Sequence, residues 1–299
     1  MSEGSSSTPS NRRIYSLLCL MVSLWALNFV VARFALREIP TTVAASLRAI
    51  SAGLILLPVW FWRVRAKAEP PLSRQDLPLL AMLSFLGVAL NQLCFLLGIE
   101  RTSTSHAAVL IGLTPLFVLV ASAVWGLEKL TARRMVGMGV ALSGVAVLQM
   151  TRASSGEATI LGDLLIAGAS LTFAIYTVMG KKLTARQGGL TIATFSYVIG
   201  GLLLSPAAIW HGIGFDFGSV SGVAWTSLAY MTLFPSALCY LIFHYALKHI
   251  PASRVSNVGY LQPLLATMLG IWLLGDTVSS ELVAGGSLVV TGVFLSERG

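Results

Sequence analysis

Long apolar runs separated by short polar stretches dominate the sequence. The hydrocarbon core of a bilayer is about 30 Å thick, so a helix that spans it needs about 20 predominantly apolar residues. Ten segments are compatible with that length: 14–36, 40–62, 77–98, 103–126, 135–151, 161–180, 190–210, 223–247, 251–274 and 281–297. The pattern predicts an all-α integral membrane protein with ten transmembrane helices.

The region before the first apolar run is polar and rich in serine. We expect residues 1–13 to form a disordered cytoplasmic tail. The run that follows is too long for a cleavable signal peptide, and Trp25, Asn28 and Arg33 are poor neighbours for a cleavage site.

The composition supports a membrane protein and excludes several soluble classes. Of 299 residues, 56% are hydrophobic and 11% are charged, with a mean hydropathy of +0.81. Soluble domains carry about 25% charged residues, so this chain cannot cover a water-facing surface. A cytoplasmic enzyme, a nucleic-acid-binding domain and a disordered protein are therefore excluded. Cys19, Cys94 and Cys239 lie within apolar runs and are expected to be small buried hydrophobes.

The distribution of Lys and Arg predicts the orientation of the chain. If the N-terminus is cytoplasmic, 15 of the 20 basic residues lie on the cytoplasmic side and four on the other side, with Arg48 inside a span. Positive charge accumulates on the cytoplasmic side of membrane proteins. We therefore expect both termini in the cytoplasm and an even number of helices.

The two halves of the chain repeat each other at a shift of 148 residues. The shift pairs identical prolines, glycines and other residues: Pro58 with Pro206, Trp62 with Trp210, Gly53 with Gly201, Phe95 with Phe243, Pro115 with Pro263, Gly137 with Gly285, and Gly144 with Gly292. Trp25 is paired with Phe173, and Arg33 with Lys181. The predicted domains are a five-helix repeat over 14–151 and a second over 161–298. Because five is odd, the second copy enters the membrane from the opposite side, which is the usual architecture of secondary transporters.

Short motifs in both halves resemble those of a known family. They are Trp25 to Phe29, Arg48, Thr102 to Ser105 followed by Pro115 and Glu128, then Ile250 to Ser256, Tyr260 to Pro263, and Gly275-Asp276. With these motifs the chain resembles the drug/metabolite transporter superfamily, with two EamA-type domains, and is most similar to bacterial amino-acid exporters, including the aromatic type. The resemblance implies a ten-helix basket in the bacterial inner membrane. Its central cavity would be formed by helices 1, 3, 4, 6, 8 and 9, with helices 5 and 10 outside.

Ionisable groups inside the predicted spans are few. No Asp or Glu lies in the middle of a span, which favours export that is weakly coupled or uncoupled to ions. Arg48 is a candidate to capture a substrate carboxylate, and the alternative is an arginine that snorkels or pairs helices. His244 is a candidate proton relay, or else a histidine hydrogen-bonded between helices or in the cavity wall.

Aromatic and amide side chains complete the set of candidate site residues. Such groups hold a zwitterion by hydrogen bonds while rings pack an apolar side chain, and the alternative is ordinary helix packing. The candidate substrate-binding residues are Trp25, Asn28, Arg48, Asn91, Gln92, Tyr176, Tyr240, His244, Tyr260 and Gln262.

Prolines and glycines point to bends and close helix contacts. Pro115, Pro235 and Pro263 interrupt predicted helices and act either as hinges or as static bends. The paired glycines of segments 135–151 and 281–297 predict close helix contact, either within the basket or between protomers.

These observations predict a secondary transporter that exports amino acids, aromatic or other apolar ones included, and related small metabolites by alternating access. Export of nucleobases, sugars or drugs is the alternative within the superfamily. A membrane-embedded enzyme or sensor is a distant alternative, because no Ser/His/Asp set has a plausible common location. We expect no enzymatic activity, cofactor, metal or nucleic-acid partner, and a monomer or homodimer in the lipid bilayer.

Overall fold

The computed structural model describes residues 11–126, 131–150, 159–275 and 278–297, and within them the chain is helical with no strand. Residues 1–10 of the expected tail, Glu128 and Asp276 lie outside this description. The first half contains α1 (Asn11–Leu36), α2 (Thr41–Arg65), α3 (Leu77–Ser84), α4 (Asn91–Ile99), α5 (Thr104–Ile111), α6 (Thr114–Val124) and α7 (Ala132–Met150). The second half contains α9 (Ile160–Gln187), α10 (Gly189–Gly212), α11 (Gly222–Met231), α12 (Cys239–His249), α13 (Ala252–Asn257), α14 (Leu261–Leu269) and α15 (Ser280–Glu297). Because α1 begins at Asn11, residues 11–13 are helical, which corrects the expected extent of the tail.

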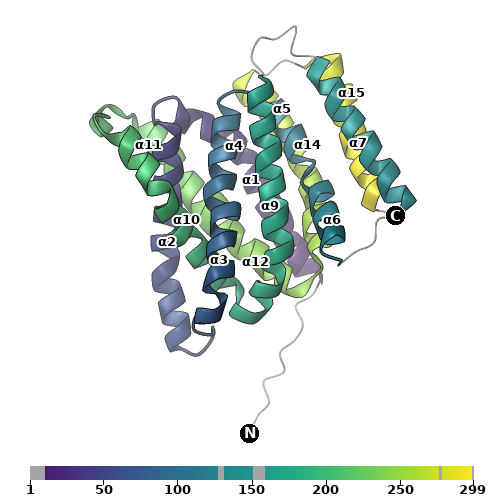
Figure 1. Ribbon diagram of the computed structural model, residues 1–299. Coiled ribbons are helices and arrows are strands. Elements are labelled where there is room, and N and C mark those ends of the chain that lie inside the picture. Colours follow the sequence, from purple (N-terminus) through teal and green to yellow (C-terminus); the bar gives the residue numbers. More distant parts are fainter. Residues whose placement is uncertain (1–10, 127–130, 151–158, 276–277, 298–299) are drawn as a thin grey trace.

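Seven helices within the described ranges are long and apolar enough to cross a membrane. They cover Asn11–Leu36, Thr41–Arg65, Arg74–Ile99, His106–Val124, Ile160–Gln187, Gly189–Gly212 and Gly222–His249. The other three predicted segments are also helical, as α7, as α13 to the π-helix η6 (Gly270–Leu274), and as α15. Helices α7 and α15 lie side by side at one edge of the bundle (Figure 1).

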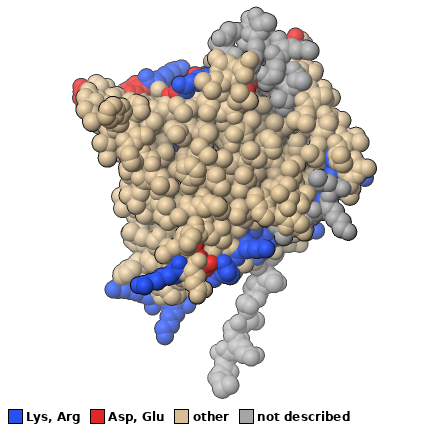
Figure 2. Space-filling view, viewed as in Figure 1, with Lys and Arg blue, Asp and Glu red and all other residues tan. Residues whose placement is uncertain are grey.

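The outer surface of the bundle is apolar between two charged ends. Large side chains such as Trp62, Trp210 and Trp272 are exposed, the last by 79%. Figure 2 shows Lys, Arg, Asp and Glu gathered at opposite ends of a broad uncharged band. Such a band is the surface that a bilayer covers and water does not.

Two π-helical segments occupy equivalent positions in the two halves. They are η2 (Phe85–Leu90), which joins α3 to α4, and η4 (Thr232–Leu238), which joins α11 to α12. Gly87 in η2 and Pro235 in η4 are separated by the repeat shift of 148 residues. A π-segment loosens the backbone hydrogen-bond ladder of a helix and often marks a functional site.

Glycines bring equivalent helices of the two halves together in reciprocal contacts. A Cβ atom added at Gly53 in α2 would lie 2.8 Å from Val198 in α10, and one added at Gly201 would lie 2.7 Å from Ile50. Gly53 and Gly201 are equivalent by the shift of 148 residues, and so are Ile50 and Val198. Each contact is therefore made twice, as expected for two copies related by a pseudo-two-fold axis.

The pair α7 and α15 repeats this arrangement. A Cβ atom at Gly144 would lie 2.6 Å from the Gly285 carbonyl oxygen, and one at Gly292 would lie 2.6 Å from the Gly137 carbonyl oxygen. The glycine stripes therefore pack within one chain, which answers the question that the sequence left open between contacts inside the basket and contacts between protomers.

The basic residues Arg33 and Lys181 occupy equivalent positions, and each donates hydrogen bonds to backbone carbonyl oxygens in its own half. The guanidinium of Arg33 donates to the Thr102 carbonyl. Lys181 Nζ donates to the carbonyl oxygens of Ile250 at 2.7 Å and Leu247 at 2.8 Å. Thr102 and Ile250 are also 148 residues apart. In each half, one basic side chain therefore binds the carbonyl end of a neighbouring helix.

Two side-chain clusters join the halves. One lies between the α1–α2 connection and the start of α11, and the other lies between the start of α3 and the end of α9. These segments are at opposite ends of the bundle (Figure 1). In the Glu38 clasp, the backbone N–H and hydroxyl of Ser221 donate to the Glu38 carboxylate at 2.6 and 2.7 Å. In the Asp76 clasp, Arg186 and Gln187 both donate to the Asp76 carboxylate. Positions 38 and 186 are equivalent, so the same site carries a carboxylate at one end and a guanidinium at the other.

Candidate functional site

A central cavity lies between the two halves of the chain. It encloses about 950 Å³ of atom-free space, including its opening. The lining residues come from both halves and are Met21, Trp25, Asn28, Phe29, Arg48, Asn91, Gln92, Phe95, Ile111, Thr114, Pro115, Ala169, Ser170, Phe173, Thr177, Tyr197, Tyr240, Phe243, Val255, Ser256, Gly259 and Gln262.

One wall of the cavity is built from aromatic rings. The ring of Trp25 on α1 meets Phe173 on α9 edge to face, with centroids 5.6 Å apart. Tyr240 and Phe243 on α12 pack against the same two rings, with 6.4 Å between the centroids of Tyr240 and Trp25 and 5.1 Å between those of Phe243 and Phe173. These are favourable geometries for aromatic pairs, so the wall is held by ring-to-ring contacts.

The polar atoms of two rings are fixed by the π-segments. Trp25 Nε1 donates to the Pro235 carbonyl oxygen at 3.1 Å, and Tyr240 OH donates to the Gly87 carbonyl oxygen at 2.8 Å. Gly87 and Pro235 are the equivalent residues of η2 and η4, so each half supplies a ring that binds the π-segment of the other half. These hydrogen bonds orient the rings from behind and leave their carbon faces for the cavity.

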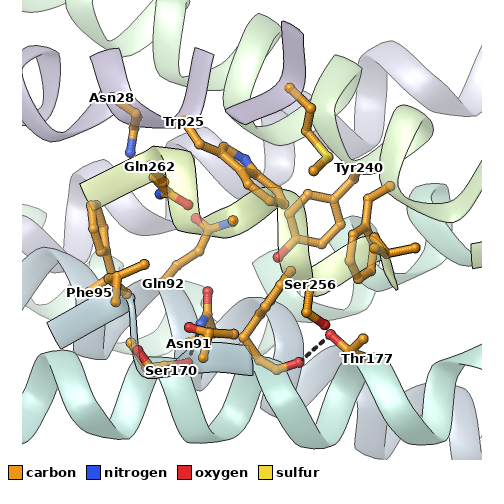
Figure 3. Close-up of a pocket in the computed structure, with 18 of the residues that line it drawn as sticks. Trp25, Asn28, Asn91, Gln92, Phe95, Ser170, Thr177, Tyr240, Ser256 and Gln262 are labelled. Carbon is orange, nitrogen blue, oxygen red and sulfur yellow. Dashed lines mark hydrogen bonds between the residues drawn. The ribbon is translucent and has the colours of Figure 1, made fainter. Parts of the chain in front are cut away.

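Amide side chains form a second part of the lining. In Figure 3 the amide ends of Asn28, Gln92 and Gln262 point toward one another. Asn28 is 5% exposed and Gln92 is 3% exposed, yet Asn28 Oδ1 and both polar atoms of Gln92 have no hydrogen-bond partner among the described residues. Asn91 differs, because its Nδ2 donates to the Ala169 carbonyl oxygen at 2.7 Å. Buried polar atoms are nearly always hydrogen-bonded, so the unpartnered amides are suited to a polar ligand.

Arg48 brings a positive charge to the cavity. Its side chain belongs to α2, is 5% exposed and lines the cavity. Its Nε donates to Ser236 Oγ at 2.6 Å, and no carboxylate in the described ranges pairs with it. Arg48 is therefore buried inside the bundle and not extended to the membrane surface.

Three predicted site residues do not contribute to the described lining. Tyr176 and His244 lie behind it, where Tyr176 OH is 2.7 Å from His244 Nε2 and 3.3 Å from Ser196 Oγ. His244 Nδ1 is 2.9 Å from Thr184 Oγ1, so both ring nitrogens are hydrogen-bonded between helices. The side chain of Tyr260 lies outside the described residues, although its backbone is placed in the 3₁₀-helix η5 (Val258–Tyr260).

The three predicted hinge prolines lie at interruptions of helices. Pro115 is in the first turn of α6, directly after the break that separates α5 from α6, and it lines the cavity. Pro235 lies inside η4, and Pro263 lies in α14 just after η5. Their role as moving hinges stays a prediction.

Sequence reasoning left several lining residues out of the candidate set. Phe173 and Phe243 complete the aromatic wall, and Ser170, Thr177 and Ser256 add hydroxyl groups. The repeat carried a signal for two of them, because Phe173 is the equivalent of Trp25 and Phe243 is the equivalent of Phe95. Among the described residues, no cluster of three His, Cys, Asp or Glu side chains could hold a metal ion.

Comparison with protein families finds one match that occurs twice. The model of the EamA-like transporter family matches residues 12–150 and again residues 160–298. The two matches together cover nearly the whole chain.

Similar full-length proteins occur in several microorganisms. The chain is 26% identical to the uncharacterized transporter YetK of Bacillus subtilis over 285 residues, 94% of this chain and 86% of that protein. It is 28% identical to a probable terminal-alkyne amino-acid exporter of Streptantibioticus cattleyicolor over 291 residues, 94% and 92% of the two chains. It is 26% identical to the uncharacterized inner membrane transporter YedA of Escherichia coli K12 over 287 residues, 95% and 90% of the two chains.

A solved crystal structure has a similar fold. It superimposes with a TM-score of 0.68 at 19% sequence identity and covers 96% of both chains. At that identity the likeness establishes a shared fold.

Proposed function

Because the chain belongs to the EamA-like transporter family and is a membrane transporter, we propose that it exports amino acids and related small metabolites. Aromatic and other apolar amino acids are the expected substrates. Export crosses the bacterial inner membrane and proceeds by alternating access between two inverted five-helix repeats, over 14–151 and 161–298.

The central cavity is the observation that supports this substrate class most directly. Its aromatic wall, made of Trp25, Phe173, Tyr240 and Phe243, suits an apolar side chain. The unpartnered amides of Asn28 and Gln92 suit an ammonium or carboxylate group, since an amide both donates and accepts. A zwitterion with an apolar side chain matches both parts of the lining.

The charge of the cavity supports export without obligatory ion coupling. Its lining, as far as the structure describes it, contains Arg48 and no Asp or Glu. Proton- and sodium-coupled sites in membranes generally use a carboxylate. We therefore expect substrate to move down its own gradient.

Names of similar proteins agree with this proposal. One relative is named as a probable amino-acid exporter and another as an inner membrane transporter. The ten-helix count rests on the seven candidate spans together with α7, α13 to η6, and α15. The cytoplasmic position of both termini rests on the distribution of Lys and Arg.

Efflux from liposomes tests the function. Purified protein is reconstituted into vesicles loaded with one labelled compound at a time, either phenylalanine, leucine, glutamate, uracil, glucose or a quaternary ammonium drug. With no imposed ion gradient, we expect vesicles that contain the protein to release phenylalanine and leucine roughly tenfold faster than protein-free vesicles loaded in the same way. Dissipation of a pH or sodium gradient should leave the rate unchanged.

Two outcomes would contradict the proposal. Release of uracil, glucose or the drug with no release of any amino acid would exclude the substrate class. A strict requirement for a pH or sodium gradient would exclude uncoupled export while leaving the substrate class in place.

A further inference from the structure

Arg48 and Ser236 form a hydrogen-bonded pair that joins the two repeats inside the bundle. Arg48 belongs to α2 in the first repeat, and Ser236 belongs to η4 in the second. Ser236 is fully buried, and its Oγ lies 2.6 Å from Arg48 Nε. The pair is next to the cavity, because Arg48 is one of the lining residues and Ser236 is behind it.

The backbone around Pro235 determines which way this hydrogen bond runs. Proline has no N–H, so Pro235 cannot make the α-helical hydrogen bond to the Met231 carbonyl. The hydroxyl of Ser236 donates to that same carbonyl oxygen at 2.9 Å. A hydroxyl has one proton, so Ser236 Oγ is left as an acceptor, and a guanidinium can only donate.

The orientation of the guanidinium follows from its use of Nε. With Nε held by Ser236, the remaining donors of Arg48 are the N–H groups on Nη1 and Nη2, and neither makes a hydrogen bond to a described residue. Two parallel N–H groups on Nη1 and Nη2 match the two oxygens of a carboxylate. An unpaired guanidinium inside a membrane protein also needs an anion to offset the loss of hydration.

We infer that Ser236 is a positioning residue for substrate recognition, which holds Arg48 so that its Nη1 and Nη2 groups bind the substrate carboxylate. The inference rests on the proposed function and adds a specificity to it. The transporter selects compounds that carry a free carboxylate, and amides or esters of the same amino acids bind poorly. Ser236 acts through Arg48 and does not touch the substrate.

Competition in reconstituted vesicles tests the inference. Uptake of labelled phenylalanine is measured in the presence of increasing concentrations of a competitor, either unlabelled phenylalanine or phenylalanine amide. The proteins compared are the wild type, Ser236→Ala, Arg48→Lys and the double variant. Loss of one charge-assisted hydrogen bond corresponds to roughly a tenfold change in an equilibrium constant. We expect Ser236→Ala to raise the apparent inhibition constant of phenylalanine about tenfold and leave that of the amide within twofold. In the Arg48→Lys background, Ser236→Ala should have almost no further effect, because coupled residues give non-additive changes.

The first repeat provides a matched control for packing. Ser84 is also fully buried and its hydroxyl donates to the Leu80 carbonyl oxygen at 2.6 Å, at the helix end that leads into η2. It has no arginine partner in the described structure. Ser84→Ala should therefore leave the inhibition constants of phenylalanine and its amide unchanged. The Ser84→Ala variant also shows whether loss of a buried hydroxyl group alone impairs folding or transport.

Other results separate the inference from the proposed function. Equal weakening of phenylalanine and its amide by Ser236→Ala, or fully additive effects of the two substitutions, would overturn the positioning role. Wild-type vesicles that take up no amino acid would overturn the proposed function itself. If Ser236→Ala does not fold, Ser236→Thr keeps the hydroxyl and is expected to keep the preference for phenylalanine over its amide.

Discussion

At the scale of single residues, some polar side chains of the cavity are hydrogen-bonded to other described residues of the protein and others are not. Trp25, Tyr240 and Asn91 donate to backbone carbonyls of neighbouring helices. Asn28 and Gln92 are buried, but among the described residues some of their amide atoms have no hydrogen-bond partner. An unsatisfied buried polar group destabilises a fold by about 1–3 kcal/mol, so a polar group that enters the cavity gains by hydrogen-bonding these amides.

Gln92→Met tests whether this amide serves binding or folding. Methionine has nearly the same shape but no polar atoms to leave unpartnered. We expect the midpoint of thermal unfolding in detergent to stay the same or rise, while the apparent half-saturation concentration for phenylalanine rises by roughly tenfold. Both quantities are measured on the same preparation.

Asn91→Leu is the control for Gln92→Met. It removes an amide that already donates to Ala169, so it should lower thermal stability. The binding role of Gln92 would be wrong if Gln92→Met lowered stability and left transport unchanged.

The sequence was informative about residue types and uninformative about their partners. Trp25, Asn28, Arg48, Asn91, Gln92, Tyr240 and Gln262 were predicted from polarity within apolar runs, and all of them line the cavity. Tyr176 and His244 have the same polarity but bind each other behind the wall. The bond between Arg48 and Ser236 joins residues 188 positions apart, and no local pattern predicts it.

At the scale of helices, the sequence predicted positions well and internal irregularities poorly. Each predicted apolar segment corresponds to helical structure, because a run of about 20 apolar residues has few alternatives in a bilayer. The π-segment η4 contains Pro235, which is a visible signal, whereas the equivalent η2 contains no proline. The conformation of η2 therefore depends on tertiary contacts, such as the bond from Tyr240 to Gly87.

Gly144→Ala tests the close contact between α7 and α15. The added methyl group would meet backbone atoms of Gly285 and Val289, which cannot move aside as a flexible side chain would. Overpacking of this kind typically destabilises by about 1–3 kcal/mol. We expect a lower midpoint of thermal unfolding for Gly144→Ala and, by the reciprocal contact, for Gly292→Ala.

Gly139 in the same helix is the matched control. A Cβ atom at this exposed position meets no atom within 4 Å. Gly139→Ala should keep or raise the unfolding midpoint, since alanine is favoured over glycine in a helix by about 1 kcal/mol. Equal destabilisation by both substitutions would show that the glycines matter for reasons other than this contact.

At the scale of the whole molecule, the Glu38 and Asp76 clasps join the repeats at opposite ends. Glu38 and Arg186 occupy equivalent positions, but the two clasps differ in chemistry. One pairs a carboxylate with neutral Ser221, and the other pairs a carboxylate with Arg186. Hydrogen bonds from the backbone and side chain of Ser221 lower the pKa of Glu38. The two ends of the transporter are thus closed by different interactions.

Asp76→Asn and Glu38→Gln should shift access to the cavity in opposite directions. Each weakens the contact at one end, so the population of the state that is open at that end should rise. We expect Asp76→Asn to increase labelling of a cysteine at Ser256 from the Asp76 end, and Glu38→Gln to increase it from the other end. The measurement uses an impermeant maleimide on oriented vesicles, with Cys19, Cys94 and Cys239 replaced.

Acid pH should act on the Glu38 clasp in the same direction as Glu38→Gln. A lowered pKa means that the clasp is fully stabilising above the unfolded-state pKa of 4.5 and is lost as pH falls through the lower folded-state pKa. The effect of low pH on labelling should therefore be smaller in Glu38→Gln. Equal labelling from both ends in every variant would contradict the role of the clasps.

The reciprocal glycine contacts have a consequence for how the bundle changes shape. If the two repeats exchange conformations during a transport cycle, the contact of Gly53 with Val198 becomes the contact of Gly201 with Ile50, and both exist before and after the exchange. The bond of Arg48 to Ser236 has no equivalent in the other half, because the equivalent positions carry Ser196 and Val88. The interfaces of α2 with α10 and of α7 with α15 are then the invariant frame of the molecule. Contacts that have no counterpart in the other repeat differ between the two states, and they show which state the protein occupies.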